Sequence, residues 1–170
     1  MRKTRLLVAA LLSSLPGCTQ THTRTDATSD SSFQAFLPEW ERAQTRFING
    51  DPAVWKQNAS HEPDVTIFGA FGGREKGWSE VGPRYDWASS HFKNSGATQT
   101  IEYVNTGRSG DLAFTVSIER QVAQLVDQDK PRPRRLRVTQ VFRREGGAWT
   151  LLHRHADPLV ERVAAESRRD

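Results

Sequence analysis

The sequence has little cysteine and no long apolar segment. Cys18 is the only cysteine among the 170 residues, so an internal disulfide is excluded. The apolar run at residues 6–12 is far shorter than the roughly 20 residues that cross a bilayer as a helix. No serine elbow and no cysteine nucleophile setting is present. We therefore expect neither a disulfide-stabilised fold nor a membrane-spanning helix.

The N-terminus has the order of a secretory signal peptide. Three basic residues among the first five precede the apolar run, and small residues follow, which predicts a signal peptide over residues 1–17. Leu15-Pro16-Gly17-Cys18 resembles a bacterial lipobox. This resemblance implies a lipid on Cys18 and a place in the cell envelope. Thr19 after the cysteine is compatible with the periplasmic side of the outer membrane of a Gram-negative cell. The alternative is an ordinary signal peptide with an incidental cysteine.

The predicted signal peptide contributes most of the net positive charge of the chain. The formal charge of +4 falls to +1 without the three basic residues of segment 1–17. Residues 130–144 still hold seven basic side chains and no acidic one. Only Phe142 is interleaved with them, whereas a nucleic-acid groove needs several stacking aromatic residues. We interpret the cluster as the solvated face of a strand and its turn, and expect no nucleic-acid partner.

The rest of the chain divides into a tether, one domain and a tail. Residues 18–32 are polar and predict a flexible tether. Residues 33–159 have the length of a single domain. Residues 160–170 form a polar C-terminal tail. The membrane is expected to be contacted through the lipid anchor only.

Helices are predicted in the first half of the domain. Pro38 suits a helix start and Gly50 its end, and Asp51-Pro52 opens a short helix through Trp55. A third helix has a buried face with helical spacing, made of Trp78, Val81, Tyr85, Ala88 and Phe92.

Strands are predicted in the second half. A short strand at 65–68 precedes the third helix and ends in a glycine-rich bend, Gly69 to Gly73. Four longer strands follow, at 97–106, 112–126, 134–144 and 148–155. Their short connections favour an antiparallel meander. The predicted fold class is α+β.

Several motifs together resemble one superfamily. They are Gly50-Asp51-Pro52 with Trp55, residues 64–69, Gly73 with Gly77-Trp78, residues 118–120, residues 137–139, and residues 149–158. The order of elements is similar to the nuclear transport factor 2-like superfamily, and most similar to its SnoaL-like, ketosteroid-isomerase-like branch, over residues 36–159. The resemblance implies a cone-shaped, curved antiparallel sheet packed against three N-terminal helices, a small-molecule pocket, a homodimer and no cofactor. It also implies an aspartate base, for which Asp64 is the candidate. The first helix has no tyrosine, so steroid isomerisation itself is not expected.

Strand alternation predicts a pocket floor. We place Leu112, Phe114, Val116, Ile118 and Arg120 on one face, with Leu136, Val138, Gln140 and Phe142, and with Trp149, Leu151, His153 and His155. The two turns suggest a register that pairs Arg120 with Val138 and Val138 with His153, and Val116 with Phe142. Arg120 and His153 would then converge over Val138.

Nine residues are candidates for the site. The catalytic candidates are His153, His155 and Asp64. The ligand-binding candidates are Arg120, Trp55, Phe68, Tyr85, Val138 and Trp149. No metal is predicted, because the His153-x-His155 pair lacks a third ligand at suitable spacing.

Each candidate also has an alternative interpretation. Asp64 can be a solvated carboxylate, Arg120 a structural ion pair, and the two histidines the polar end of an edge strand or a dimer interface. The tryptophans can belong to the core.

Two functions remain open. One is a pocket protein that binds a small, partly apolar molecule, with or without cofactor-free acid–base chemistry. The other is a non-enzymatic, dimerising assembly or accessory module in the cell envelope. The opposite sheet face is expected to carry Arg137, Thr139, Val141 and Arg143, with Ala113, Thr115 and Ser117. That polar face favours the pocket.

Overall fold

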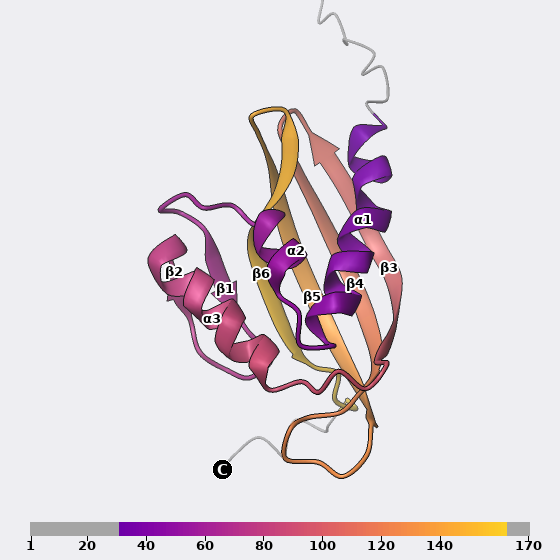
Figure 1. Cartoon of the computed structure of the whole chain (residues 1–170). Coiled ribbons are helices and arrows are strands. Elements are labelled where there is room, and N and C mark those ends of the chain that lie inside the picture. Colours follow the sequence, from indigo (N-terminus) through magenta and orange to yellow (C-terminus); the bar gives the residue numbers. More distant parts are fainter. Residues whose placement is uncertain (1–30, 163–170) are drawn as a thin grey trace, which may run out of the picture.

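The computed structural model describes residues 31–162, in which helices lie against one face of a curved sheet (Figure 1). The predicted signal peptide and Cys18 lie outside the described residues, as do most of the predicted tether and residues 163–170. None of the helices in the described part of the chain is both long and apolar enough to cross a membrane.

Helix α1 (Ser32–Phe47) begins earlier than Pro38, where its start was predicted. Pro38 lies inside the helix on its exposed side, where water can satisfy the carbonyl that loses its partner. Phe33 and Leu37 are buried before it. The Phe33 ring lies 5.2 Å from Trp149 and 5.3 Å from Phe142, between centroids. Burial of these side chains stabilises the additional turns.

The segment from Gly50 to α3 follows the prediction closely. Gly50 has a positive φ of 86°, and a Cβ there would lie 3.0 Å from the carbonyl oxygen of Phe92. The Asp51 carboxylate accepts a hydrogen bond at 3.0 Å from the backbone N–H of Ala53, the first residue of α2 (Ala53–Gln57). Strand β1 (Thr66–Phe68) and helix α3 (Trp78–Ser90) also lie where they were predicted. The two-residue strand β2 (Glu75–Lys76) was not predicted.

The long strands form the predicted antiparallel meander. They are β3 (Thr98–Ser109), β4 (Leu112–Ala123), β5 (Arg132–Glu145) and β6 (Ala148–Pro158). The six-stranded sheet has the order β2-β1-β6-β5-β4-β3. Strand β1 pairs with β6 in parallel, so the sheet is mixed at this end. The predicted α+β class is confirmed.

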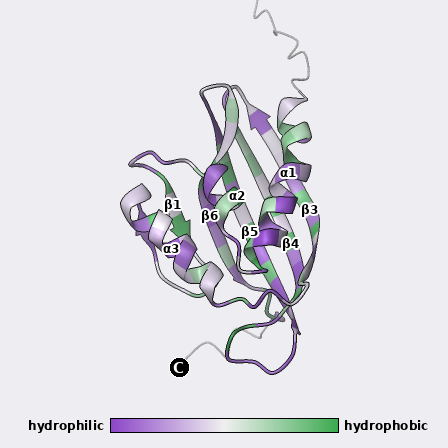
Figure 2. Ribbon diagram, in the orientation of Figure 1, coloured by the Kyte–Doolittle hydropathy of each residue, from purple (hydrophilic) through white to green (hydrophobic). Residues whose placement is uncertain are grey.

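The sheet has an inner face, covered by the helices, and an outer face. On β4 the inner face holds Ala113, Thr115, Ser117, Glu119, Gln121 and Ala123, all buried. Helices α1 and α2 lie over this face in Figure 1, and Figure 2 shows hydrophobic and hydrophilic residues alternating along the long strands. An aromatic core fills the space beneath the helices, with Trp40 4.5 Å from Trp55 and 5.7 Å from Phe142 between ring centroids.

The predicted face is right for β5 and wrong for β4. Leu136, Val138, Gln140 and Phe142 are buried, as predicted. The predicted register is wrong, because Val138 pairs with Ser117 and Ala156, and Arg120 pairs with Arg135. The apolar residues of β4 face outward and its small and polar residues face inward. The predicted register is wrong because the apolar residues of β4 were assumed to face the helices, and a shift of one residue exchanges the two faces of a strand.

A bulge at Leu152 explains the second error of phase. Val141 pairs with His153 and Phe142 pairs with Leu151, so Leu152 is an extra residue on β6. Trp149 and Leu151 are buried on the inner face, as predicted. Beyond the bulge the alternation is shifted by one, and Arg154 and Ala156 are buried instead of His153 and His155.

Candidate functional site

A cavity lies between the inner face of the sheet and the helices, and the centre of a water molecule can occupy about 60 Å³ of it. Its apolar walls include Phe47 and Ile48 from the end of α1, Trp55 from α2, Ile67 from β1, Phe71, and Tyr85, Ala88 and Phe92 from α3 and its end. Its polar lining residues include Gln44, Arg84, Gln99, Glu119, Gln121, Arg134 and Arg154. A mostly apolar cavity with a few converging polar groups is typical of a small-molecule site.

A buried ion pair lies at the sheet side of this cavity. Arg154 Nη1 donates to Glu119 Oε1 at 2.8 Å, and Nη2 donates to Oε2 at 2.7 Å. The Glu119 side chain is 0% exposed and that of Arg154 8% exposed. The pair crosses β5 diagonally over Val138, since Ser117 and Ala156 are the register partners of that residue. Such a bidentate pair holds both side chains in fixed positions.

Neighbouring groups complete the hydrogen bonding of Glu119. In the amide orientation that satisfies its neighbours, Gln44 donates to Glu119 Oε1 at 2.8 Å and accepts from Trp40 Nε1 at 3.2 Å. Gln121 Nε2 donates to Gln99 Oε1 at 2.9 Å and lies 3.5 Å from Glu119 Oε2. The Arg154 guanidinium also packs 5.4 Å from the Trp55 ring. The carboxylate is therefore fully engaged within the protein.

Two other buried polar groups have no such partner. The Tyr85 hydroxyl and Trp55 Nε1 find no hydrogen-bond partner within residues 31–162. Tyr85 is 0% exposed and Trp55 4% exposed. Burial raises the pKa of Tyr85 to about 12, and the indole N–H of the neighbouring Trp55 acts against this increase to a smaller extent, so the hydroxyl stays protonated and able to donate at neutral pH. A buried donor without an acceptor is unfavourable, which makes these two groups an incomplete hydrogen-bonding site.

A model of the SnoaL-like domain matches residues 44–161. The chain belongs to this family. The fold is that of the nuclear transport factor 2-like superfamily, and no curated protein matches the chain significantly.

Three solved structures are examples of proteins with a fold similar to that of this SnoaL-like domain. A candidate dehydratase of the NTF2-like family from Streptomyces avermitilis is 18% identical, with a TM-score of 0.64 over 77% of this chain and 96% of that one. An NTF2-like superfamily protein from Salmonella enterica serovar Typhimurium is 17% identical, with a TM-score of 0.63 over 79% and 93%. A candidate ketosteroid isomerase from Shewanella frigidimarina is 20% identical, with a TM-score of 0.57 over 75% and 95%.

Two ligand-binding candidates of the SnoaL-like domain, Trp55 and Tyr85, line the cavity. Four other candidates lie on the outer face, so the predicted convergence of Arg120 and His153 over Val138 is wrong. Arg120 Nη1 donates to Glu102 Oε2 at 2.7 Å in an exposed ion pair.

The two histidines follow each other along the outer face of β6. His153 Nδ1 lies 2.8 Å from Thr66 Oγ1, and His155 Nε2 lies 3.1 Å from Asp157 Oδ2. Both imidazoles pack against Phe68 in T-shaped arrangements, each at 5.3 Å between ring centroids. Partial burial and the nearby His155 lower the pKa of His153. These side chains lie on the far side of the sheet from the cavity.

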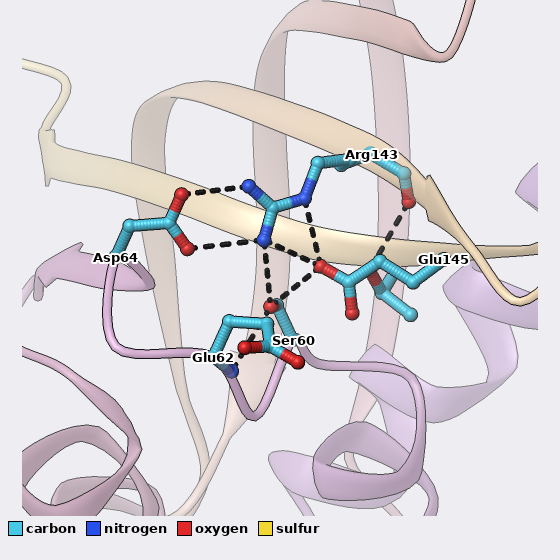
Figure 3. A network of polar contacts seen from close by, with 6 residues as sticks. Ser60, Glu62, Asp64, Arg143 and Glu145 are labelled. Atoms are coloured by element: carbon cyan, nitrogen blue, oxygen red, sulfur yellow. Dashed lines mark hydrogen bonds and ion pairs between the residues drawn. The ribbon is translucent and has the colours of Figure 1, made fainter.

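Asp64 belongs to a surface network that Figure 3 shows around Arg143. Arg143 donates to the two Asp64 oxygens at 2.6 and 3.0 Å and to Glu145 Oε1 at 2.8 Å, while Ser60 Oγ donates to the same Glu145 oxygen at 2.7 Å. The hydrogen bonds from Arg143 lower the pKa of Asp64. A general base works best when its pKa lies near the operating pH, and a lowered pKa makes Asp64 a weaker base. We therefore interpret Asp64 as the acidic partner of Arg143 in a structural ion pair.

The remaining candidates are outside the cavity lining. Phe68 is on the outer face, and Val138 is buried with Leu136 and Ala156. Trp149 packs on Phe33, and its Nε1 donates to Ser32 Oγ at 3.0 Å. Within residues 31–162, no three His, Cys, Asp or Glu side chains gather in a way that could hold a metal ion.

Sequence reasoning missed Glu119, Arg154, Gln44 and Arg134. The first two are each one residue away from a candidate, Arg120 and His153, because the phase was inverted on β4 and after the bulge on β6. A signal for β4 was available: its alternate residues are small, Ala113, Thr115 and Ser117, which suits the face against which helices pack closely. No comparable signal marks the bulge at Leu152.

Proposed function

We propose that this SnoaL-like domain binds a small, partly apolar molecule in the cavity and donates hydrogen bonds to one of its oxygen atoms from Tyr85 and Trp55. The observation that carries this proposal is the pair of buried donors without a partner among residues 31–162, both lining the same cavity. An acceptor oxygen of a ligand would satisfy them. The aromatic rings around them would cover its apolar part.

The same arrangement supports cofactor-free chemistry on a carbonyl compound. A protonated tyrosine and an indole N–H polarise a carbonyl group and stabilise negative charge on its oxygen. Glu119 is held by Arg154 and Gln44 and contributes a fixed charge. We infer that binding is the primary role and that stabilisation of an oxyanion is the chemistry the site favours.

The proposal can be tested by comparing the binding of cyclohexanone to the wild-type domain and to the Tyr85→Phe variant, which lacks only the hydroxyl. We expect the wild-type domain to bind the ketone, and the variant to bind it about five- to tenfold more weakly. Tyr103→Phe is the matched control, because the Tyr103 hydroxyl donates to Glu41 Oε1 at 2.9 Å and lies outside the cavity lining. Isothermal titration calorimetry measures all three proteins. Equal affinity in wild type and Tyr85→Phe would contradict the proposed contact.

A second candidate function, self-association, is favoured by the outer face. The prediction that this face carries Ala113, Thr115 and Ser117 is wrong. It carries Leu112, Phe114 and Val122 of β4, which are 50%, 38% and 48% exposed, and Val104 of β3, which is 63% exposed. An exposed apolar surface of this kind is typical of a protein interface.

The occupant we propose for the outer face is a second copy of the chain. Cations on this face stand beside carboxylates, as in Arg120–Glu102 and Arg137–Asp157, so the face presents both signs of charge, which suits association with its own copy. Phe114→Glu should convert a dimer to a monomer in sedimentation equilibrium. Val160→Glu changes an exposed valine after β6 and should leave the dimer intact. A monomeric wild-type protein would refute this candidate.

We also propose that a lipid on Cys18 holds the domain in the cell envelope, on the lipobox-like sequence before this residue. Cys18→Ser should move the protein from the membrane fraction to the soluble fraction of the expressing cells. Retention of the variant in the membrane fraction would contradict the anchor.

A further inference from the structure

We infer that the molecule bound in the cavity is a small carboxylate with an apolar body, and that Arg134 holds its negative charge. This inference rests on the proposed binding function and specifies the class of ligand. It starts from the charges that line the cavity, where cationic side chains outnumber anionic ones.

Three arginines line the cavity, and two of them are paired. Arg154 forms the bidentate pair with Glu119. Arg84 Nε lies 3.4 Å from Glu75 Oε1. Arg134 is at the beginning of β5, and its side chain forms no hydrogen bond or ion pair within the part of the chain that the structure describes. One positive charge in the lining is therefore uncompensated.

The position of Arg134 is fixed by aromatic rings. Its guanidinium carbon lies 5.0 Å from the centroid of Phe71 and 5.7 Å from that of Phe92, and both rings line the cavity. These contacts attract the cation but leave its N–H donors unused. Partial burial lowers the pKa of Arg134, which reflects the cost of removing the guanidinium from water. An anion beside it would offset that cost.

Residues 31–162 place no anion beside Arg134. The register partner of Arg134 on β4 is Gln121, which is neutral. Glu119 is the next inner-face residue along β4, and its oxygens accept from Arg154 and Gln44. Along the chain, residues 130–144 contain no acidic residue, and Arg132 and Arg135 are exposed beside Arg134. Neighbouring positive charges of this kind attract anions toward the site.

Arg134 and the Tyr85–Trp55 pair are two separate polar points on the wall of one cavity. A carboxylate with a second oxygen acceptor, joined by a short apolar body, would satisfy both. A guanidinium recognises a carboxylate through two parallel hydrogen bonds, and these charge-assisted bonds are stronger than those to a neutral amide. The inference therefore predicts discrimination between an acid and its amide of the same shape.

Three matched probes test it: cyclohexanone, 4-oxocyclohexanecarboxylate and 4-oxocyclohexanecarboxamide. We expect wild type to bind the carboxylate about tenfold or more tightly than the carboxamide. Arg134→Gln should abolish this preference, so that the variant binds the carboxylate and the carboxamide with equal affinity. Arg134→Lys, which keeps the charge without the planar group, should retain part of it. Arg135→Gln changes the next residue, which is exposed, and should retain all of it.

The outcomes separate this inference from the function on which it rests. Equal affinity of wild type for the carboxylate and the carboxamide would refute the inference and leave ketone binding in place. A preference that survives in Arg134→Gln would also refute it. If none of the three probes binds the wild-type domain, the proposed binding function fails, and the inference fails with it.

Discussion

The two faces of β4 have the opposite polarity to that of most strands with one covered face, which are apolar on the covered side and polar on the exposed side. Its covered inner face carries Thr115, Ser117, Glu119 and Gln121, and its outer face carries Leu112, Phe114, Val116 and Ile118. Glu119 and Gln121 line the cavity, and Thr115 donates to the buried side chain of Gln140. The outer apolar residues are partly exposed in the single chain. In β4, therefore, the polarity of a residue depends on what its face of the strand contacts, and does not indicate how deeply the residue is buried.

The largest effect in this comparison is expected for the ion pair of the inner face. Glu119→Gln leaves Arg154 charged and buried, so the free energy of unfolding should fall by about 3–5 kcal/mol. Glu102→Gln breaks the outer pair with Arg120, whose side chains are 58% and 48% exposed, and should cost about 1 kcal/mol or less. Urea denaturation measures both variants.

A further variant separates loss of charge from loss of packing. Adding Arg154→Met to Glu119→Gln removes the uncompensated charge and should recover part of the stability. Equal losses in the inner and outer single variants would show that the inner pair is not effectively buried in solution.

The next effect concerns the outer face. A Cβ at Gly107 of β3 would lie 2.3 Å from a ring carbon of Phe114, its partner on β4, so Gly107→Ala must displace this ring. We expect a loss of about 1–3 kcal/mol in the free energy of unfolding, and weaker self-association in sedimentation equilibrium. The double variant with Phe114→Leu should recover stability, because a smaller side chain removes the overlap. No recovery would mean that the ring is not the cause.

A smaller effect is expected at Ser117. Its hydroxyl is buried on the inner face and has no hydrogen-bond partner within residues 31–162. Ser117→Ala should leave the free energy of unfolding unchanged or raise it by up to about 1 kcal/mol, since an unsatisfied polar atom is removed. Thermal unfolding measures the change. A clear loss would indicate that the hydroxyl contacts a bound molecule in solution.

The smallest effect concerns pH. Because the pKa of His153 is lowered in the folded protein by burial and by His155, the folded state favours the neutral imidazole. Its contribution to stability is present above the ordinary value of 6.5 and is lost as the pH falls through the lowered pKa. His153→Gln should flatten the profile of stability against pH on the acid side of pH 6.5, as measured by urea denaturation at several pH values.

More of the fold than of the candidate site could be predicted from the sequence. Proline, glycine and helical spacing located α2 and α3, and turn residues located the meander, because these signals are local. The site depends on which side of a strand each residue faces. The apolar residues of β4 indicated the wrong side, and the extra residue Leu152 shifted the second half of β6 without a local signal. Trp55 and Tyr85 were found because their helices were placed correctly.

The bulge at Leu152 also divides β6 into two parts with different neighbours. Before it, β6 is bordered on its free side by a single bridge, from Ala59 to Leu151, and after it β1 lies alongside from His153 to His155. One strand therefore begins as a sheet edge and ends as an interior strand. Amide hydrogens should exchange with solvent sooner in the first part than in the second. The first part would be the place where a foreign strand adds to the sheet, and the segment Asn58 to Ser60 shields it by binding the backbone of Leu151.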